Sequence, residues 1–274
     1  EQGKVTPNTQ IQTAPGSLTI GPATIRDAHP AGLITVSEVI QKSSNVGSAK
    51  IALGLQAESM WAVFDGMGFG ASPKLGLPGE AAGRVRPAKT WRPIEQATMS
   101  YGHGIAISLV HLARAYTVFA REGDMVPMSL LKVGSPVAGK PIISAKTAHE
   151  IRKMLELAVQ SGGTAPRAQI MGYRVGGKTG TARKLENGIY AADKHVASFV
   201  GLAPASQPRL IVAVMIDEPR AGQYYGGVVA APVFADVMGG ALRILGVNPD
   251  APMKNPHSVV TLHLVDREGE PTRV

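Results

Sequence analysis

The sequence predicts a mixed α/β fold of the α+β type, in which helices come first and a largely antiparallel sheet follows. Helical periodicity dominates between about residues 35 and 159, and apolar runs rich in β-branched residues follow between about 173 and 216. One further helical pattern closes this region. Strands that succeed one another without intervening helices usually pair antiparallel, and the last helix can then cover the sheet.

The first expected helix is interrupted by polar residues. Residues 1–30 are rich in Thr, Pro and Gly and are expected to form loops and short strands. A helix is then expected from Thr35, because Thr35 and Glu38 match a capping box whose side chains satisfy free backbone donors. Ser43-Ser44-Asn45 breaks this helix soon afterwards. Since such side chains compete with the backbone for hydrogen bonds, the break can present polar groups.

The remaining elements follow from apolar periodicity bounded by Gly, Pro and Ser. Short strands are expected at 11–13 and 18–20, helices at 49–55, 58–67, 108–122, 144–159 and 231–245, and the strands of the main sheet at 173–182, 195–202 and 210–216. We expect one domain, residues 1–247, and a polar, proline-rich C-terminal tail, residues 248–274.

The composition argues against several classes of function. The 274 residues include no cysteine, which excludes thiolate metal sites, and the histidines are dispersed, so we expect neither a metal nor a cofactor. The net charge of +8 would favour polyanions. The basic residues are scattered, however, and aromatic residues make up only 5% of the chain, so we expect no nucleic-acid groove.

The strongest local signal is GGKTGTA at residues 176–182. Residues 172–179 (GYRVGGKT) satisfy the phosphate-loop pattern G-x-x-x-x-G-K-[ST]. A phosphate loop must follow a buried strand and open a helix, and neither flank of this segment has the required pattern. Nucleotide binding is therefore a distant alternative.

A second chemistry, acyl transfer by a serine enzyme, uses a Lys-Thr-Gly strand and a Ser-x-Asn turn on opposite sides of one site. Ser43-Ser44-Asn45 interrupts a predicted helix, and Lys178-Thr179-Gly180 lies on a predicted strand 133 residues later, 178 minus 45. Each motif alone is weak evidence. Both motifs in this order and in these contexts indicate acyl transfer.

Longer segments resemble the class B penicillin-binding proteins, and most closely the cell-division (septal) transpeptidases of Gram-negative bacteria. The similar segments are KSSNVGSAKIALGL (42–55), MSYGHGIAISLVHLARAYTVFA (99–120), GGKTGTARK (176–184), HVASFVGLAPA (195–205) and IDEPRAGQYYGG (216–227). The resemblance implies a penicillin-binding or serine β-lactamase-like fold and peptidoglycan D,D-transpeptidase activity. It implies stem peptides, β-lactams and division-complex membrane proteins as partners, at the periplasmic face of the inner membrane, with an anchor outside this chain.

The resemblance also implies a nucleophile in a Ser-x-x-Lys motif that precedes the Ser-x-Asn motif. Nothing before Ser43 matches it. The one match in the chain, Ser129-Leu130-Leu131-Lys132, follows Ser43 and is interpreted as a chance match to a loose pattern. We expect the serine upstream of Glu1, and we expect residues 1–274 alone to be inactive.

Three catalytic roles follow from the resemblance. Ser43 would relay a proton from the upstream lysine, and Asn45 would hold that lysine and the peptide group of the substrate. Lys178 would keep the site positive and so favour a neutral upstream lysine.

Substrate binding is expected of the strand and of three aromatic side chains. The hydroxyls of Thr179 and Thr181, on either side of Gly180, would bind a carboxylate, and the Thr181 N–H would form part of an oxyanion hole. Tyr224-Tyr225 would form either an aromatic wall for the acyl side chain or a plain turn, and His103 is a candidate to face the cleft.

Two alternatives share the fold. A serine β-lactamase would need a base for rapid deacylation, such as a well-placed glutamate, and no convincing candidate stands out. A β-lactam-sensing domain would bind without crosslinking.

Overall fold

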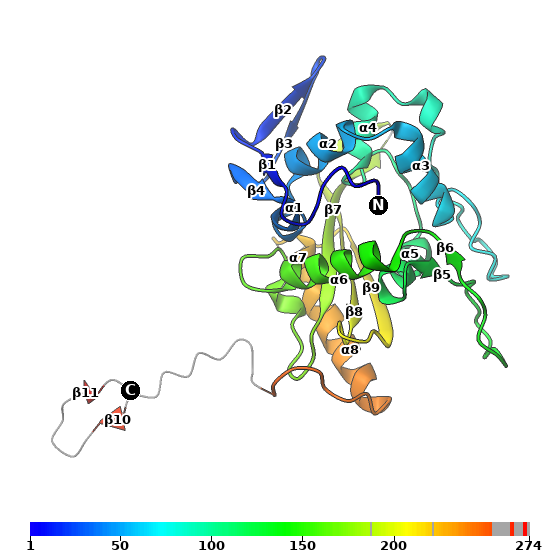
Figure 1. Ribbon diagram of the computed structural model, residues 1–274, viewed down its shortest axis with the longest axis vertical. Coiled ribbons are helices and arrows are strands. Elements are labelled where there is room, and N and C mark those ends of the chain that lie inside the picture. Colours follow the sequence, from blue (N-terminus) through cyan, green and yellow to red (C-terminus); the bar gives the residue numbers. More distant parts are fainter. Residues whose placement is uncertain (187, 221, 254–263, 266–270, 273–274) are drawn as a thin grey trace.

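The computed structural model describes all residues except 187, 221, 254–263, 266–270 and 273–274 (Figure 1). The helices are α1 (Val36–Lys42), α2 (Asn45–Leu53), α3 (Ala57–Gly66), α4 (Pro93–Met99), α5 (Leu109–Ala120), α6 (Ala145–Val159), α7 (Gly226–Val229) and α8 (Ala231–Ile244), with 3₁₀ turns η1 (Ala88–Thr90) and η2 (Pro166–Ala168). The strands are β1 (Gln10–Gln12), β2 (Ser17–Ile20), β3 (Ala23–Arg26), β4 (Leu33–Thr35), β5 (Asp124–Met125), β6 (Lys140–Pro141), β7 (Gly176–Glu186), β8 (Ile189–Ala203), β9 (Leu210–Asp217), β10 (Leu264–Val265) and β11 (Pro271–Thr272).

The main sheet has the order β7-β8-β9, and both pairings are antiparallel. Helices α5, α6 and α8 lie beside these three strands (Figure 1). This arrangement confirms the predicted α+β fold with an antiparallel sheet.

Helices cover both faces of the sheet, and successive side chains of a strand point to opposite faces. On β8, Phe199 belongs to a buried cluster with Phe234 and Met238 of α8. Its neighbour Val200 belongs to another buried cluster with Leu155 of α6. The C-terminal half of β8 is therefore buried and apolar on both faces.

A second packed unit precedes the sheet in the chain. Strand β1 pairs with β4, β2 pairs with β3, and the helices α1, α2 and α4 lie nearby (Figure 1). Ile25 of β3 packs against Val46 and Ala49 of α2 and Ala97 of α4. The predicted capping box is confirmed: the N–H of Thr35 donates to Glu38, and the N–H of Glu38 donates to Thr35 Oγ1.

Much of the predicted tail, residues 248–274, lies outside the described residues. Its first residues contact the ends of the main sheet. Asp250 accepts hydrogen bonds from the backbone N–H of Arg174, which precedes β7, at 2.7 Å and from Ser206 Oγ, which follows β8, at 2.5 Å. No helix in the described part of the chain is long and apolar enough to span a bilayer.

Candidate active site

The predicted break after the first helix is confirmed, and its geometry is unusual. Ser43 ends α1 in the left-handed region, with φ 57° and ψ 47°, which residues other than glycine seldom adopt. Ser44 then caps α2, because its Oγ accepts a hydrogen bond from the N–H of Gly47 at 2.9 Å. The Ser-x-Asn motif therefore forms the junction between two helices.

The end of β3 anchors this junction. Asp27 accepts a hydrogen bond from Ser44 Oγ at 2.7 Å and another from the N–H of Val46 at 2.9 Å. The side-chain amide of Asn45 donates to the carbonyl of Arg26 at 2.9 Å. Sequence reasoning missed Asp27, since one acidic residue in a loop gives no signal of its contacts.

The two motifs meet at a lysine. Lys178 lies on β7, and its Nζ donates a hydrogen bond to Ser43 Oγ at 2.8 Å. The same Nζ lies 3.2 Å from the Thr179 carbonyl oxygen and 3.3 Å from Thr179 Oγ1. Burial disfavours the charged form and lowers the pKa of Lys178 to about 8. Near neutral pH this amine therefore loses its proton more easily than a solvated lysine.

The hydroxyls of the two site threonines have different partners. Thr179 Oγ1 donates to Thr164 Oγ1 at 3.0 Å. Thr181 Oγ1 accepts from the N–H of Gly226, the first residue of α7, at 3.1 Å. Gly180 lies between them, and a Cβ at this position would come within 2.5 Å of Ser198 Oγ on β8. A larger residue here would require the Ser198 side chain to adopt another rotamer.

Aromatic side chains adjoin Thr181 through α7. Tyr224 and Tyr225 directly precede Gly226 and are partly exposed. The Tyr224 ring stacks on His195 of β8 with centroids 4.1 Å apart, and it lies 4.6 Å from the Tyr225 ring. The two tyrosines and His195 thus form one aromatic group beside the candidate site, and His195 is a member that sequence reasoning missed.

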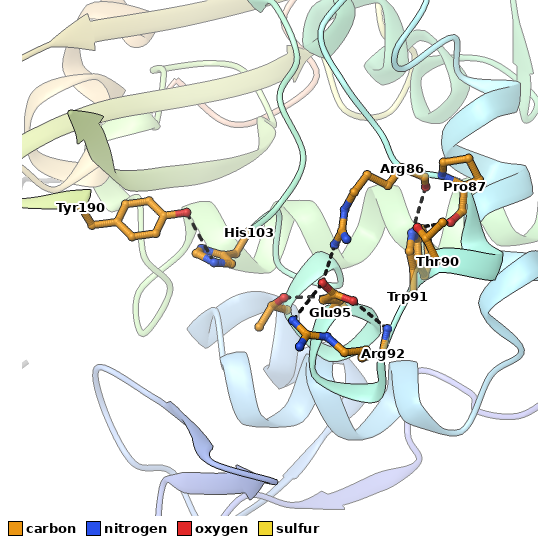
Figure 2. A network of polar contacts seen from close by, with 9 residues as sticks. Arg86, Pro87, Thr90, Trp91, Arg92, Glu95, His103 and Tyr190 are labelled. Atoms are coloured by element: carbon orange, nitrogen blue, oxygen red, sulfur yellow. Dashed lines mark hydrogen bonds and ion pairs between the residues drawn. The ribbon is translucent and has the colours of Figure 1, made fainter. Parts of the chain in front are cut away.

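His103 lies after α4, where its Nε2 is 3.5 Å from Tyr190 Oη of β8 and the two ring centroids are 5.3 Å apart (Figure 2). Figure 2 shows that the same polar network continues to the start of α4. The link is Thr98, whose carbonyl accepts from the N–H of His103 at 3.1 Å and whose Oγ1 donates to the Glu95 carbonyl at 3.2 Å. There Glu95 accepts from the N–H of Arg92 and pairs with Arg86 at 2.9 Å, and these groups lower the pKa of Glu95 to about 2. His103 is therefore placed against the β7–β8 hairpin, and its part in the site stays a prediction.

Two sequence matches have ordinary structural explanations. Ser129 lies in the exposed segment between β5 and β6, where its Oγ donates to the Leu131 carbonyl at 2.7 Å. Lys178 and Thr179, which would end a phosphate loop, belong to strand β7 and do not open a helix. This geometry contradicts the nucleotide-binding alternative.

Comparisons with known proteins agree with this geometry. The family model described as penicillin binding protein transpeptidase domain matches residues 1–239. The probable peptidoglycan D,D-transpeptidase PenA of Neisseria flavescens is 46% identical over 259 residues, covering 94% of this chain and 64% of the relative. The peptidoglycan D,D-transpeptidase FtsI of Escherichia coli K12 is 38% identical over 251 residues, which cover 92% of this chain and 42% of the relative. The chain thus spans less than two thirds of the length of these curated relatives.

Solved structures are also similar. The apo structure of the TP domain from Burkholderia pseudomallei penicillin-binding protein 3 superposes with a TM-score of 0.87 at 49% identity, covering 90% of this chain and 76% of that one. A structure described as a peptidoglycan glycosyltransferase from Burkholderia ambifaria has a TM-score of 0.84 at 48% identity, and the match covers 90% of this chain and 75% of that one.

Proposed function

Because the chain belongs to the penicillin-binding protein transpeptidase family, and within it to class B, we propose that it forms the acyl-transfer site of a peptidoglycan D,D-transpeptidase. The hydrogen bond of 2.8 Å between Lys178 Nζ and Ser43 Oγ carries the proposal, since it joins the two motifs that serine acyl transfer requires. The full-length protein would crosslink stem peptides during septal wall synthesis and would be acylated by β-lactams.

The proposed reaction has two steps. A serine supplied by sequence preceding Glu1 attacks the carbonyl carbon of the donor peptide, and its proton passes to the neighbouring lysine of the Ser-x-x-Lys motif. Ser43 relays a proton to the amine that departs as the peptide C–N bond breaks. The amine of a second stem peptide then attacks the acyl ester, loses its proton and restores the serine. Asn45 would hold the lysine and the substrate amide, and Lys178 would keep the site positive.

Strand β7 would bind the donor peptide. It is an outer strand of the sheet, so alternate backbone N–H and C=O groups face away from β8 and can pair with an extended peptide. The substrate carboxylate would be bound by the hydroxyls beside Gly180, and the Thr181 N–H would help to stabilise the oxyanion.

Tyr224 and Tyr225 would form an aromatic wall for the acyl side chain. Their partial exposure and their proximity to Thr181 through Gly226 support this role. His103, whose Nε2 lies 3.5 Å from Tyr190 Oη, would line the approach to the cleft.

We also propose a location at the periplasmic face of the inner membrane and contacts with membrane proteins of the division complex. The similarity to FtsI of Escherichia coli supports both proposals.

Acylation of the full-length protein tests the proposal. We expect a fluorescent penicillin to label it covalently and a chromogenic β-lactam to turn over very slowly. Lys178→Ala should reduce labelling by at least about tenfold, because the charge and the Ser43 contact are lost. Lys194→Ala is the matched control, since Lys194 pairs with Glu186 on the hairpin. Rapid multiple turnover would instead identify a β-lactamase, and absence of labelling would contradict acyl transfer altogether.

A further inference from the structure

Lys184 lies near the C-terminal end of β7, where the pairing of β7 with β8 becomes irregular. Before it, Arg183 pairs with His195, and after it, Leu185 pairs with Tyr190. An advance of two residues on β7 (183 to 185) thus corresponds to five on β8 (195 to 190). Irregularities of this kind re-aim the side chains beside them. Among the described residues, the register assigns Lys184 no partner on β8.

The side chain of Lys184 reaches past β8 to the end of β9. Its Nζ lies 2.7 Å from Glu218 Oε1 and 3.0 Å from the carboxylate of Asp217, the last residue of β9. A single ion pair on the surface contributes little to stability. This ammonium contacts two carboxylates at once, however, and the side chain is only 26% exposed. Lys184 therefore links the two outer strands of the sheet, β7 and β9.

Glu218 has a backbone conformation that depends on its contacts. Its φ is 50°, in the left-handed region that residues other than glycine seldom adopt. Such a conformation persists only where the surrounding structure holds it. Two contacts do so here: the Glu218 N–H donates to the His195 carbonyl at 2.9 Å, and the side chain pairs with Lys184. The direction in which the chain leaves β9 therefore depends on Lys184.

The connection that begins at Glu218 leads to the aromatic side chains beside the site. Tyr224 stacks on the His195 ring with centroids 4.1 Å apart and an interplanar angle of 14°, and Tyr225 follows directly. His195 thus contacts this connection twice, through its carbonyl at Glu218 and through its ring at Tyr224. Because ring stacking depends on the offset and the separation of the rings, a change at Glu218 would also move Tyr224.

We propose that Lys184 is a positioning residue for the acyl side chain of the substrate: by holding Glu218, it sets the place of the wall formed by Tyr224-Tyr225. Strand β7 contacts both ends of the connection, since Thr181 accepts a hydrogen bond from the N–H of Gly226 directly after the tyrosines. This inference rests on the proposed function, because it explains how the proposed aromatic wall is held.

Loss of Lys184 would then affect substrates according to their acyl side chains. A displaced wall should weaken contacts with an aromatic side chain, while the reaction at the β-lactam carbonyl should proceed as before. A general loosening of the fold would instead slow acylation by all β-lactams alike. Selectivity between two β-lactams therefore separates positioning from a merely structural role.

The test measures second-order rate constants of acylation of the full-length protein by two penicillins, in competition with a fluorescent penicillin. Benzylpenicillin carries an acyl side chain with a phenyl ring, and 6-aminopenicillanic acid has the same nucleus without that side chain. The readout is the ratio of the first rate constant to the second. Lys184→Ala removes the ion pairs, and Lys184→Arg keeps the charge. Lys194→Ala is the matched control, because Lys194 pairs with Glu186 within the same hairpin.

We expect Lys184→Ala to lower this ratio about 3- to 10-fold, the size of one lost aromatic contact. Lys184→Arg and Lys194→Ala should keep the wild-type ratio. Tyr224→Ala combined with Tyr225→Ala should also lower the ratio. Adding Lys184→Ala to that double variant should have no further effect, because the changes act on the same contact.

An unchanged ratio in Lys184→Ala, or equal slowing with both penicillins, would overturn the inference while wild-type acylation upholds the proposed function. A wild-type ratio equal to that of the variant without both tyrosines would overturn the inference and the aromatic wall, and would leave acyl transfer intact. No acylation of the wild type by either compound would overturn acyl transfer as well. If circular dichroism shows that Lys184→Ala is unfolded, Glu218→Gln, which removes the paired charge and keeps the shape, decides by the same ratio.

Discussion

Asp27 acts on the candidate site through its neighbours, without touching Lys178 or Ser43 itself. Its two oxygens hold Ser44 and the N–H of Val46, and both of these partners are buried. These hydrogen bonds contribute to stability because a buried polar group that loses its partner keeps the full free-energy cost of desolvation. Asp27 therefore holds the two residues Ser44 and Val46, which follow Ser43, and in this way supports the left-handed conformation of Ser43.

Asp27→Ala should destabilise the protein by about 2 kcal/mol, because two buried donors lose their acceptor. It should also slow acylation, since Ser43 would no longer be held toward Lys178. Urea unfolding and penicillin labelling measure the two effects. Asp236→Ala, at an exposed position of α8, is the control and should change the stability by less than about 0.5 kcal/mol. Equal behaviour of the two variants would contradict the anchoring role.

The pKa of Lys178, about 8 in the folded protein against an ordinary 10.5, predicts a pH-dependent stability difference. Between these two values the unfolded chain binds a proton that the folded protein does not bind. The free energy of unfolding should therefore decrease as the pH falls from about 10 to 8, and this contribution of Lys178 should not change further below pH 8. Lys178→Met removes it, so the variant should gain about 2 kcal/mol relative to wild type over this range, a value reduced for partial exposure. Urea unfolding at several pH values measures the difference, and a pH-independent difference would refute the explanation.

At the residue scale, the motifs predicted that Ser43 and Lys178 line one site, but not their direct hydrogen bond or the residues that hold them. Ser-x-Asn and Lys-Thr-Gly have fixed spacings that can be recognised in a sequence. Asp27 and Thr164 are single common residues whose contacts arise only from tertiary packing. Their hydrogen bonds to Ser44 and Thr179 span 17 and 15 residues, without a pattern that identifies them.

Among the elements, α7 is short but joins the sheet to the site. A Cβ at its first residue, Gly226, would overlap the Ser198 carbonyl oxygen and come within 2.6 Å of the Gly180 carbonyl oxygen. This close approach lets the Gly226 N–H reach Thr181. Helix α7 therefore depends on glycine for its position against β7 and β8.

Gly226→Ala should destabilise the protein by about 1–3 kcal/mol, because backbone atoms on two strands would have to move. Gly240→Ala is the matched control: Gly240 lies in α8, and a Cβ there meets nothing within 4 Å. Alanine is the better helix former, so this substitution should stabilise by about 0.5–1 kcal/mol. Thermal unfolding should show shifts of opposite sign, and shifts of the same sign would contradict the packing argument.

Sequence patterns predicted the longer elements well and missed several short ones. The amphipathic periodicity of residues 144–159 closely matches α6, and Ser144 is its N-cap. Strands β3 and β4 and helix α4 have three to seven residues each, too few for a period to emerge. Strand β8 begins at Ile189, six residues before the predicted start, because pairing with β7 extends it through polar residues.

On the scale of the whole molecule, α6 supports both halves of the site. Leu155 of α6 lies in one buried cluster with Ile40 of α1, which carries the chain to Ser43. On β7, a Cβ at Gly176 would lie 3.4 Å from Leu155 Cβ, two residues before Lys178. The order of elements could be predicted from the sequence, but this shared support could not, because helical periodicity shows a buried face without showing its neighbours.

Leu155→Ala should therefore affect stability and acylation together. The side chain is 5% exposed, and its truncation should leave a cavity that costs about 2–5 kcal/mol of unfolding free energy. Acylation should also slow under conditions in which the variant remains folded, because α1 and β7 would lose their common contact and the distance between Ser43 and Lys178 would vary. Leu131→Ala, at a position that is 81% exposed, is the control and should change neither property. Loss of stability with unchanged acylation of the folded fraction would show that α6 supports the core without positioning the site.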